Sequence, residues 1–85
     1  MLFRSVSIRK EVSDRIIYFC NKRNMAINTL ARVSAVPPST LKNIISGGSK
    51  NPGIVTIKKL CDGLEINIID FFDTDAFKNL EQEIE

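Results

Sequence analysis

The stretch INTLARVSAVPPSTLKNII, residues 27–45, decides how this chain folds. Apolar residues recur at helical spacing over residues 27–34 and again over residues 38–45. Between the two runs, Pro37 disfavours helical dihedrals in the residue before it, and Pro38 suits the first position of a new helix because no N–H donor is needed there. The stretch therefore predicts two short helices joined by a tight turn, which is a helix-turn-helix.

The second helix of this pair leaves polar side chains between its apolar positions. The four are Ser39, Thr40, Lys42 and Asn43. Lysine donates hydrogen bonds to guanine or phosphate, asparagine can bond adenine through two hydrogen bonds, and hydroxyl groups can bond either kind of site. The pattern favours DNA binding, although a purely structural helical hairpin has the same apolar spacing.

The rest of the 85-residue chain predicts further short helices. Three are expected, over residues 8–23, 54–64 and 68–72, and a loop dense in Gly, Ser, Asn and Pro covers residues 46–53. Ser7 and Asn67 are polar residues suited to the N-cap positions of the first and the last of these helices. The sequence therefore predicts an all-α fold: a compact bundle of five short helices around the helix-turn-helix, followed by a short C-terminal helical tail.

The net charge of +2 conceals a strong asymmetry along the chain. Residues 1–60 carry 11 Lys or Arg and 2 Asp or Glu, whereas residues 61–85 carry 1 Lys and 8 Asp or Glu. The balances are +9 and −7, which indicates a polyanionic partner for the first part or, more simply, two solvated surfaces of opposite sign. Five basic residues belong to the first expected helix, where a solvated face is the simpler interpretation: Arg9, Lys10, Arg15, Lys22 and Arg23.

The residue types exclude most kinds of site chemistry. The chain has no histidine, the residue most used for proton transfer near neutral pH and the commonest metal ligand. Cys20 and Cys61 stand among apolar neighbours, and we expect them to be small buried hydrophobes rather than a disulfide or zinc ligands. The longest apolar run has five residues, too few to span a membrane. We expect a cytoplasmic protein with no catalytic activity, no metal and no cofactor.

Sequence patterns across most of the chain resemble a known family. The residues that carry the resemblance are Leu30-Ala31, Ser34, Val36, Ser39-Thr40-Leu41 and Ile44, then Asn51-Pro52, then Leu60-Cys61-Asp62, Leu64 and Ile66. In this order and spacing they are similar to the Cro/CI-type (Xre-like) helix-turn-helix DNA-binding domain. The resemblance implies a dimeric, repressor-like transcriptional regulator of bacteria or phages, with double-stranded DNA as its partner. We assign residues 1–72 to this domain and residues 73–85 to an acidic amphipathic tail.

The resemblance also implies roles for individual residues. Base edges in the major groove would be read by Pro38, Ser39, Lys42 and Asn43. DNA phosphates would be contacted by Asn28, Thr29, Thr40, Gly48, Ser49, Lys50 and Asn51. Within the last of these segments, Lys50 supplies charge, and glycine lets backbone amides approach a phosphate closely.

Four departures from the family pattern have structural consequences. Ala35 stands where the family usually has a glycine in the turn, so it must adopt the turn dihedrals with a Cβ present. The dipeptide Ala26-Ile27 lacks the family's polar cap and phosphate-binding glutamine, and Pro37 replaces a capping Ser or Thr. Cys20 and Ile45 replace an Arg–Glu ion pair that often joins the first helix to the third, and we hypothesise that their side chains touch.

The C-terminal tail admits two interpretations. Phe77, Leu80 and Ile84 recur at helical spacing, which suits packing either on the domain's own core or on a second copy. A homodimer would be held through Ile69, Phe72, Phe77 and Leu80.

The fold also admits a second function. It can serve as a protein-interaction module or an antitoxin-type domain, in which the helix over residues 38–45 reads no bases. The two prolines and the missing phosphate-binding glutamine favour this alternative, whereas the polar face of the helix favours DNA. Selection of binding sites from a random DNA pool discriminates between the two.

Overall fold

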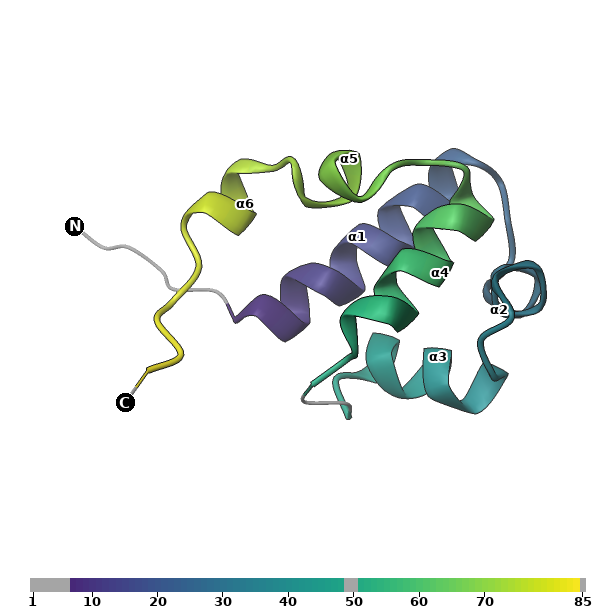
Figure 1. Ribbon diagram of the computed structural model, residues 1–85, viewed down its shortest axis with the longest axis horizontal. Helices are drawn as coiled ribbons and strands as arrows, with labels where there is room; N and C mark the ends of the chain where they lie inside the picture. Colours follow the sequence, from purple (N-terminus) through teal and green to yellow (C-terminus); the bar gives the residue numbers. More distant parts are fainter. Residues whose placement is uncertain (1–6, 49–50, 85) are drawn as a thin grey trace.

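The computed structural model describes residues 7–48 and 51–84, which fold into six α-helices (Figure 1). The helices are α1 (Ile8–Lys22), α2 (Ile27–Ser34), α3 (Pro38–Ser46), α4 (Ile54–Leu64), α5 (Ile68–Phe72) and α6 (Asp75–Lys78). They confirm the expected all-α fold: five helices, of which α2 and α3 form the helix-turn-helix, are followed by the short helix α6. No helix in this part of the chain is long and apolar enough to cross a membrane.

One hydrophobic core joins the helices. α2 packs against α4, α3 packs against α1 and α2, and α5 packs against α4. The fully buried side chains come from five of the helices: Ile16, Leu30, Leu41, Leu60, Cys61, Leu64 and Phe71. Burial of each large apolar side chain contributes about 1.5–3 kcal/mol to folding. Figure 1 shows α3 along one edge of the molecule and α5 and α6 along the opposite edge.

The approach of α2 to α4 depends on a glycine. A Cβ atom added at Gly63 would lie 2.0 Å from the Ser34 Oγ and 3.2 Å from the Leu30 Cδ1, so only glycine fits without a shift of the Ser34 side chain or of the helices. The Ser34 side chain is 5% exposed, and its Oγ has no hydrogen-bond partner among the described residues. The contact therefore places a buried hydroxyl group directly against the backbone of α4.

α5 is fastened to α1 by a single arginine. The Arg15 Nε donates a hydrogen bond to the Phe71 carbonyl oxygen at 2.7 Å, and its Nη2 donates one to the Asp70 carbonyl oxygen at 2.6 Å. The guanidinium also lies over the Phe19 ring, 4.5 Å from its centroid. Arg15 thus satisfies carbonyl groups near the end of α5, which the sequence interpretation of a solvated basic face did not include.

The C-terminal tail is less helical than its spacing predicted. Phe77 packs edge-on against Phe72, with ring centroids 4.9 Å apart, and both contact the buried Phe71. α6 nevertheless ends at Lys78, so Leu80 lies beyond it and Ile84, 80% exposed, has no place on the core. A four-residue helix has too few hydrogen bonds to extend itself without buried apolar contacts. The expected helical stripe therefore holds for Phe77 and is wrong for Leu80 and Ile84.

Both cysteines are free and buried, as expected for small hydrophobes. Burial raises the pKa of the Cys20 thiol. Burial also raises the pKa of the Cys61 thiol, and the nearby Asp62 carboxylate adds to that effect. Both thiols therefore stay protonated near neutral pH, which suits a structural role rather than a nucleophilic one.

Candidate nucleic-acid interface

The turn between α2 and α3 has the geometry that the sequence required of Ala35. This residue takes a left-handed conformation, with φ 58° and ψ 37°. The next residue, Val36, donates a backbone hydrogen bond to the Ala31 carbonyl oxygen at 3.0 Å, and its side chain is 4% exposed. The turn is therefore anchored in the core and fixes the angle at which α3 leaves α2.

One face of α3 is buried and the other is open to solvent. Leu41 and Ile44 are at most 2% exposed and hold the helix on the core. The four predicted base-reading residues are all exposed: Pro38, Ser39, Lys42 and Asn43. Lys42 has no ion-pair partner within residues 7–48 and 51–84, so its charge is available to a ligand. α3 thus presents together the residues that the sequence analysis assigned to base reading.

The helix N-termini fall into two classes. In α1, α5 and α6 the N-cap side chain accepts a hydrogen bond from a backbone N–H of the first turn: Ser7, Asn67 and Thr74. The N-cap residues of α2, α3 and α4 make no such bond: Ala26, Pro37 and Gly53. The uncapped helices are the helix-turn-helix pair and the helix after the loop. Unsatisfied N–H groups at a helix N-terminus bind anions such as phosphate.

Four of the described residues predicted to contact phosphate lie close to these uncapped ends, whereas Gly48 follows the C-terminal end of α3. Asn28 is exposed and Thr29 half-buried in the first turn of α2, and Asn51 is exposed shortly before α4. Gly48 is exposed, and its backbone N–H donates to the Asn43 carbonyl oxygen at 2.9 Å. Thr40 is half-buried in the first turn of α3. Ser49 and Lys50 lie outside the described residues.

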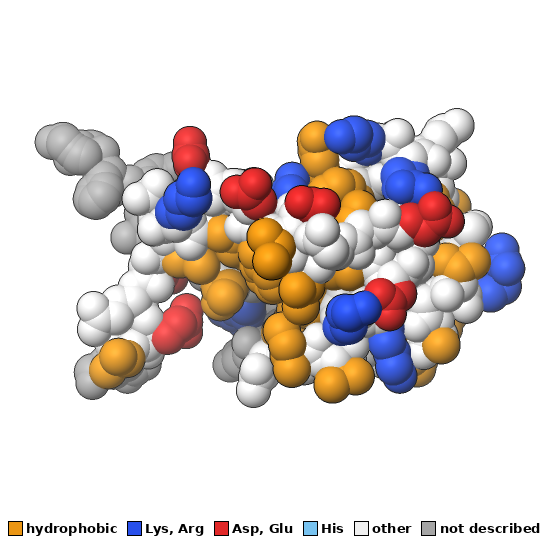
Figure 2. Space-filling model, turned by 45° about the horizontal axis from the view of Figure 1, so that its top comes forward, with side chains coloured by type: hydrophobic (Ala, Val, Ile, Leu, Met, Phe, Trp, Pro, Cys, Tyr) orange, Lys and Arg blue, Asp and Glu red, His pale blue; other side chains and the backbone are white. Residues whose placement is uncertain are grey.

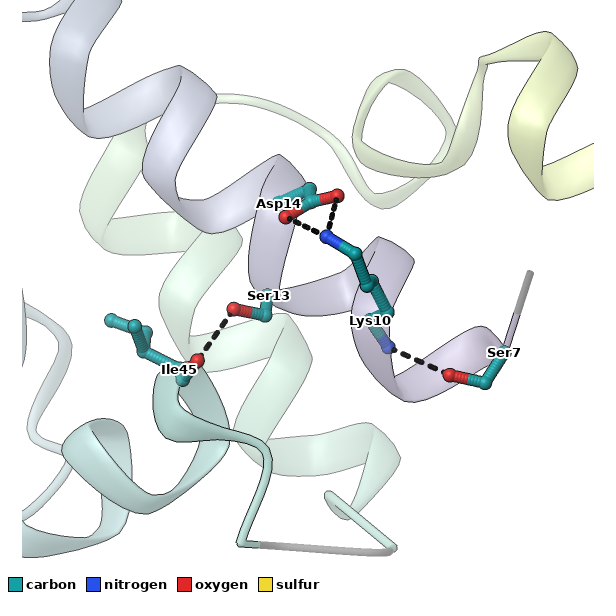
Figure 3. A network of polar contacts seen from close by, with 5 residues as sticks. All are labelled: Ser7, Lys10, Ser13, Asp14 and Ile45. Carbon is teal, nitrogen blue, oxygen red and sulfur yellow. Dashed lines mark hydrogen bonds and ion pairs between the residues drawn. The ribbon is translucent and has the colours of Figure 1, made fainter.

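Ser13 holds the C-terminal end of α3 in place, as Figure 3 shows. Its Oγ donates a hydrogen bond to the Ile45 carbonyl oxygen at 2.8 Å, and the side chain is 7% exposed. Sequence reasoning did not identify this contact, although a serine between Val12 and Ile16 on an apolar stripe is a signal of a buried polar partner. The hypothesis that Cys20 touches Ile45 stays a prediction.

Opposite charges adjoin over much of the surface (Figure 2), whereas Lys42 on α3 has no acidic partner among the described residues. Several cations outside α3 are engaged within the chain, since Arg23 pairs with Glu65 at 3.2 Å and Lys58 pairs with Asp62. The α5 and α6 segment carries exposed carboxylates, and Figure 2 shows acidic side chains along this side of the molecule. Because α5 and α6 lie opposite α3 in Figure 1, a polyanion bound at α3 is kept away from these carboxylates.

The comparisons with known proteins agree with this geometry. A solved structure of prophage Lp1 protein 11 has 30% sequence identity and a TM-score of 0.78, and the alignment covers 91% of this chain and all of that one. The restriction-modification controller protein C.Esp1396I has 24% identity and a TM-score of 0.71, with 84% and 90% covered.

The SinR protein/SinI protein complex contains a chain with 22% identity and a TM-score of 0.69, with 85% of this chain and 69% of that one covered. The last two likenesses show the shared fold alone. No curated protein sequence matches the chain at a significant level. A sequence profile of the Cro/C1-type HTH DNA-binding domain matches residues 15–76, almost three quarters of the chain, and the protein therefore belongs to this family.

Proposed function

We propose that the protein is a sequence-specific regulator of transcription that binds double-stranded DNA and inserts α3 into the major groove, acting as a repressor. The observation that carries the proposal is the exposed face of α3, where Ser39, Lys42 and Asn43 point to solvent while Leu41 and Ile44 fix the helix. Recognition helices of this type place their N-terminal residues against base edges. The side chains on this face are those that bond bases in the major groove.

The backbone of the DNA would be held on both sides of α3. The free N–H groups of the first turns of α2 and α4 would donate to phosphate oxygens, with Asn28 and Asn51 beside them. These contacts set position and supply affinity but carry no sequence information. The missing glutamine at the start of α2 therefore lowers affinity without removing the anion site formed by the backbone.

We also propose that the regulator acts as a homodimer through its α5 end, with residues 1–72 as the DNA-binding unit and residues 73–85 as an acidic tail. Ile69 on α5 is 74% exposed and would form the centre of this contact. Phe72 and Phe77 pack on Phe71 of their own chain, so they would support this surface rather than form its centre. Leu80 is half-buried beyond α6 and would contribute at the edge.

Selection from a randomised pool of DNA duplexes tests the DNA-binding proposal. A dimer should select a palindromic motif with half-sites about one helical turn (~34 Å) apart, because a two-fold symmetric protein binds a two-fold symmetric operator. We propose that it does so in the cytoplasm of a bacterium. Affinity should fall steeply with salt, because bound phosphates release counterions. Salt-sensitive binding without a motif would contradict base reading by α3. Absence of binding to any DNA would favour the protein-interaction module instead.

The dimer is tested separately by sedimentation equilibrium of Ile69→Asp. A buried carboxylate at the centre of the contact should weaken self-association at least about tenfold. Ile84→Asp is the matched control, since it changes an equally exposed isoleucine in the tail and should leave association unchanged. A wild-type chain that stays monomeric at millimolar concentration would overturn the dimer proposal. The DNA-binding proposal would then stand for a monomer.

A further inference from the structure

The tip of α3 differs chemically from the tips of the two other uncapped helices. Pro37 is the N-cap residue, with φ −57° and ψ 137°, and Pro38 is the first residue of the helix. Both rings are exposed, and neither residue has a backbone N–H. In α3 the first backbone bond of the helix runs from the Leu41 N–H to the Pro37 carbonyl oxygen at 3.1 Å, so only two N–H groups remain free, those of Ser39 and Thr40.

α2 and α4 retain three free N–H groups each. Their first helical bonds run from Leu30 to the Ala26 carbonyl oxygen and from Ile57 to the Gly53 carbonyl oxygen, both at 3.0 Å. The N–H groups before Leu30 and Ile57 therefore point out of the helix without an intrahelical acceptor. The tip of α3 has fewer donors for a phosphate than either neighbour, and the two residues there that lack an N–H are both exposed prolines.

The two prolines are not required for packing of the turn. The buried apolar position between α2 and α3 is filled by Val36, which is 4% exposed, and the rings of Pro37 and Pro38 lie outside it. A Ser or Thr at the N-cap would have stabilised the helix through a side-chain hydrogen bond, and no side-chain cap is present here. The exposed rings therefore mark a surface suited to contact with something apolar.

We infer that Pro38, with Pro37 beside it, contacts the 5-methyl group of a thymine and thereby selects that base in each half-site. The inference rests on the proposed function, since it assumes that α3 lies in the major groove. The N-terminal residues of a recognition helix are the ones that meet base edges, and the thymine methyl is the apolar group that B-DNA presents in this groove. Lys42 lies one turn after Pro38 on the same side of α3, so the bases that the two residues contact should be close neighbours.

Replacement of thymine by uracil tests this contact, because it removes the methyl group and leaves every hydrogen-bonding group of the base in place. Each thymine of the selected operator is replaced in turn, and the dissociation constant is measured for the wild type, Pro38→Ser and Pro52→Ala. Burial of one methyl group predicts that one thymine per half-site binds the wild type about fourfold more tightly than uracil does. The ratio should fall close to one in Pro38→Ser.

Pro52→Ala is the matched control, because Pro52 precedes α4 and lies outside α3. It should keep the thymine-to-uracil ratio even if its overall affinity falls. A wild-type protein that binds thymine and uracil equally at every position would overturn the inference. A Pro38→Ser variant whose thymine-to-uracil ratio equals that of the wild type at every position would also overturn it. A chain that selects no sequence at all would overturn the proposed function and the inference together, whereas the other two outcomes leave the proposed function standing.

Discussion

The α2–α4 side of the molecule and its α5–α6 end differ in how their helices begin. α5 and α6 start with Asn67 and Thr74, whose side chains satisfy backbone N–H groups, and they carry exposed carboxylates. α2, α3 and α4 start without side-chain caps and leave their first N–H groups free. At the α5–α6 end, side chains of the same chain accept hydrogen bonds from backbone N–H groups at the helix N-termini. On the α2–α4 side, such N–H groups remain free to donate to an anionic partner. Stability, self-association and DNA binding should therefore respond to different substitutions.

The largest expected effect is on the contact between α2 and α4. Gly63→Ala should lower the free energy of unfolding by about 3 kcal/mol, because its Cβ would overlap the Ser34 Oγ and displace that side chain or the helices. Urea unfolding followed by circular dichroism measures this loss. In a Ser34→Ala background the overlapping hydroxyl is absent, so the same substitution should cost less. Equal losses in the two backgrounds would show that Ser34 does not set this spacing.

Removal of the arginine that fastens α5 should have the next largest effect. Arg15→Met should lower the free energy of unfolding by about 2 kcal/mol, because two carbonyl groups of α5 lose a charged donor while the apolar contact with Phe19 is kept. Lys10→Met is the control on the same helix, since it breaks only an exposed ion pair with Asp14 and should cost at most about 0.5 kcal/mol. Similar losses in both variants would contradict a special role for Arg15.

An effect of similar size, but confined to DNA binding, is expected at the exposed face of α3. Asn43→Ala should relax preference at one base pair of each half-site by about 1–3 kcal/mol, with little change in thermal stability. Binding to a panel of operators with single base changes measures this preference. Asn79→Ala, at the α6 end, should leave the whole panel unchanged. An Asn43→Ala variant that discriminates all base pairs as the wild type does would remove Asn43 from base reading.

The smallest effect concerns the turn. Ala35→Gly should raise the free energy of unfolding by about 1 kcal/mol, because glycine adopts φ 58° without the strain that a Cβ causes. Ala76→Gly, inside α6, is the matched control and should lower stability instead. Thermal melting of the two variants gives the sign of each change. A less stable Ala35→Gly variant would mean that the lower entropy of the unfolded alanine chain outweighs the strain.

Local sequence patterns predicted most of the fold, because the bounds and caps of helices depend on residues that are close together in the sequence. The caps at Ser7 and Asn67 follow from short-range spacing, and the structure confirms both. The turn conformation of Ala35 was implied by the family resemblance, and the structure shows it to be left-handed. Short-range spacing also predicted the bounds of the helix-turn-helix, since Pro37 and Pro38 define where α3 begins. Residue types and spacing were therefore enough to place the exposed face of α3.

Contacts between distant segments could not be predicted in the same way. The bond from Ser13 to Ile45 and the bonds from Arg15 to α5 join residues that no local pattern relates. Gly63 gave no sign of its close approach to Ser34, because either residue alone is ordinary in a helix sequence. The helix predicted in the tail was too long, because spacing alone does not show whether the core has a place for Ile84.

The central claim is that α3 reads DNA sequence, and a single ratio tests it most directly. The dissociation constants for the selected operator and for a scrambled duplex of equal length and composition are measured at the same salt concentration, near 0.15 M. The account predicts that the operator binds at least about 1,000-fold more tightly, as specific DNA-binding proteins do. Equal affinities for the two duplexes would contradict it.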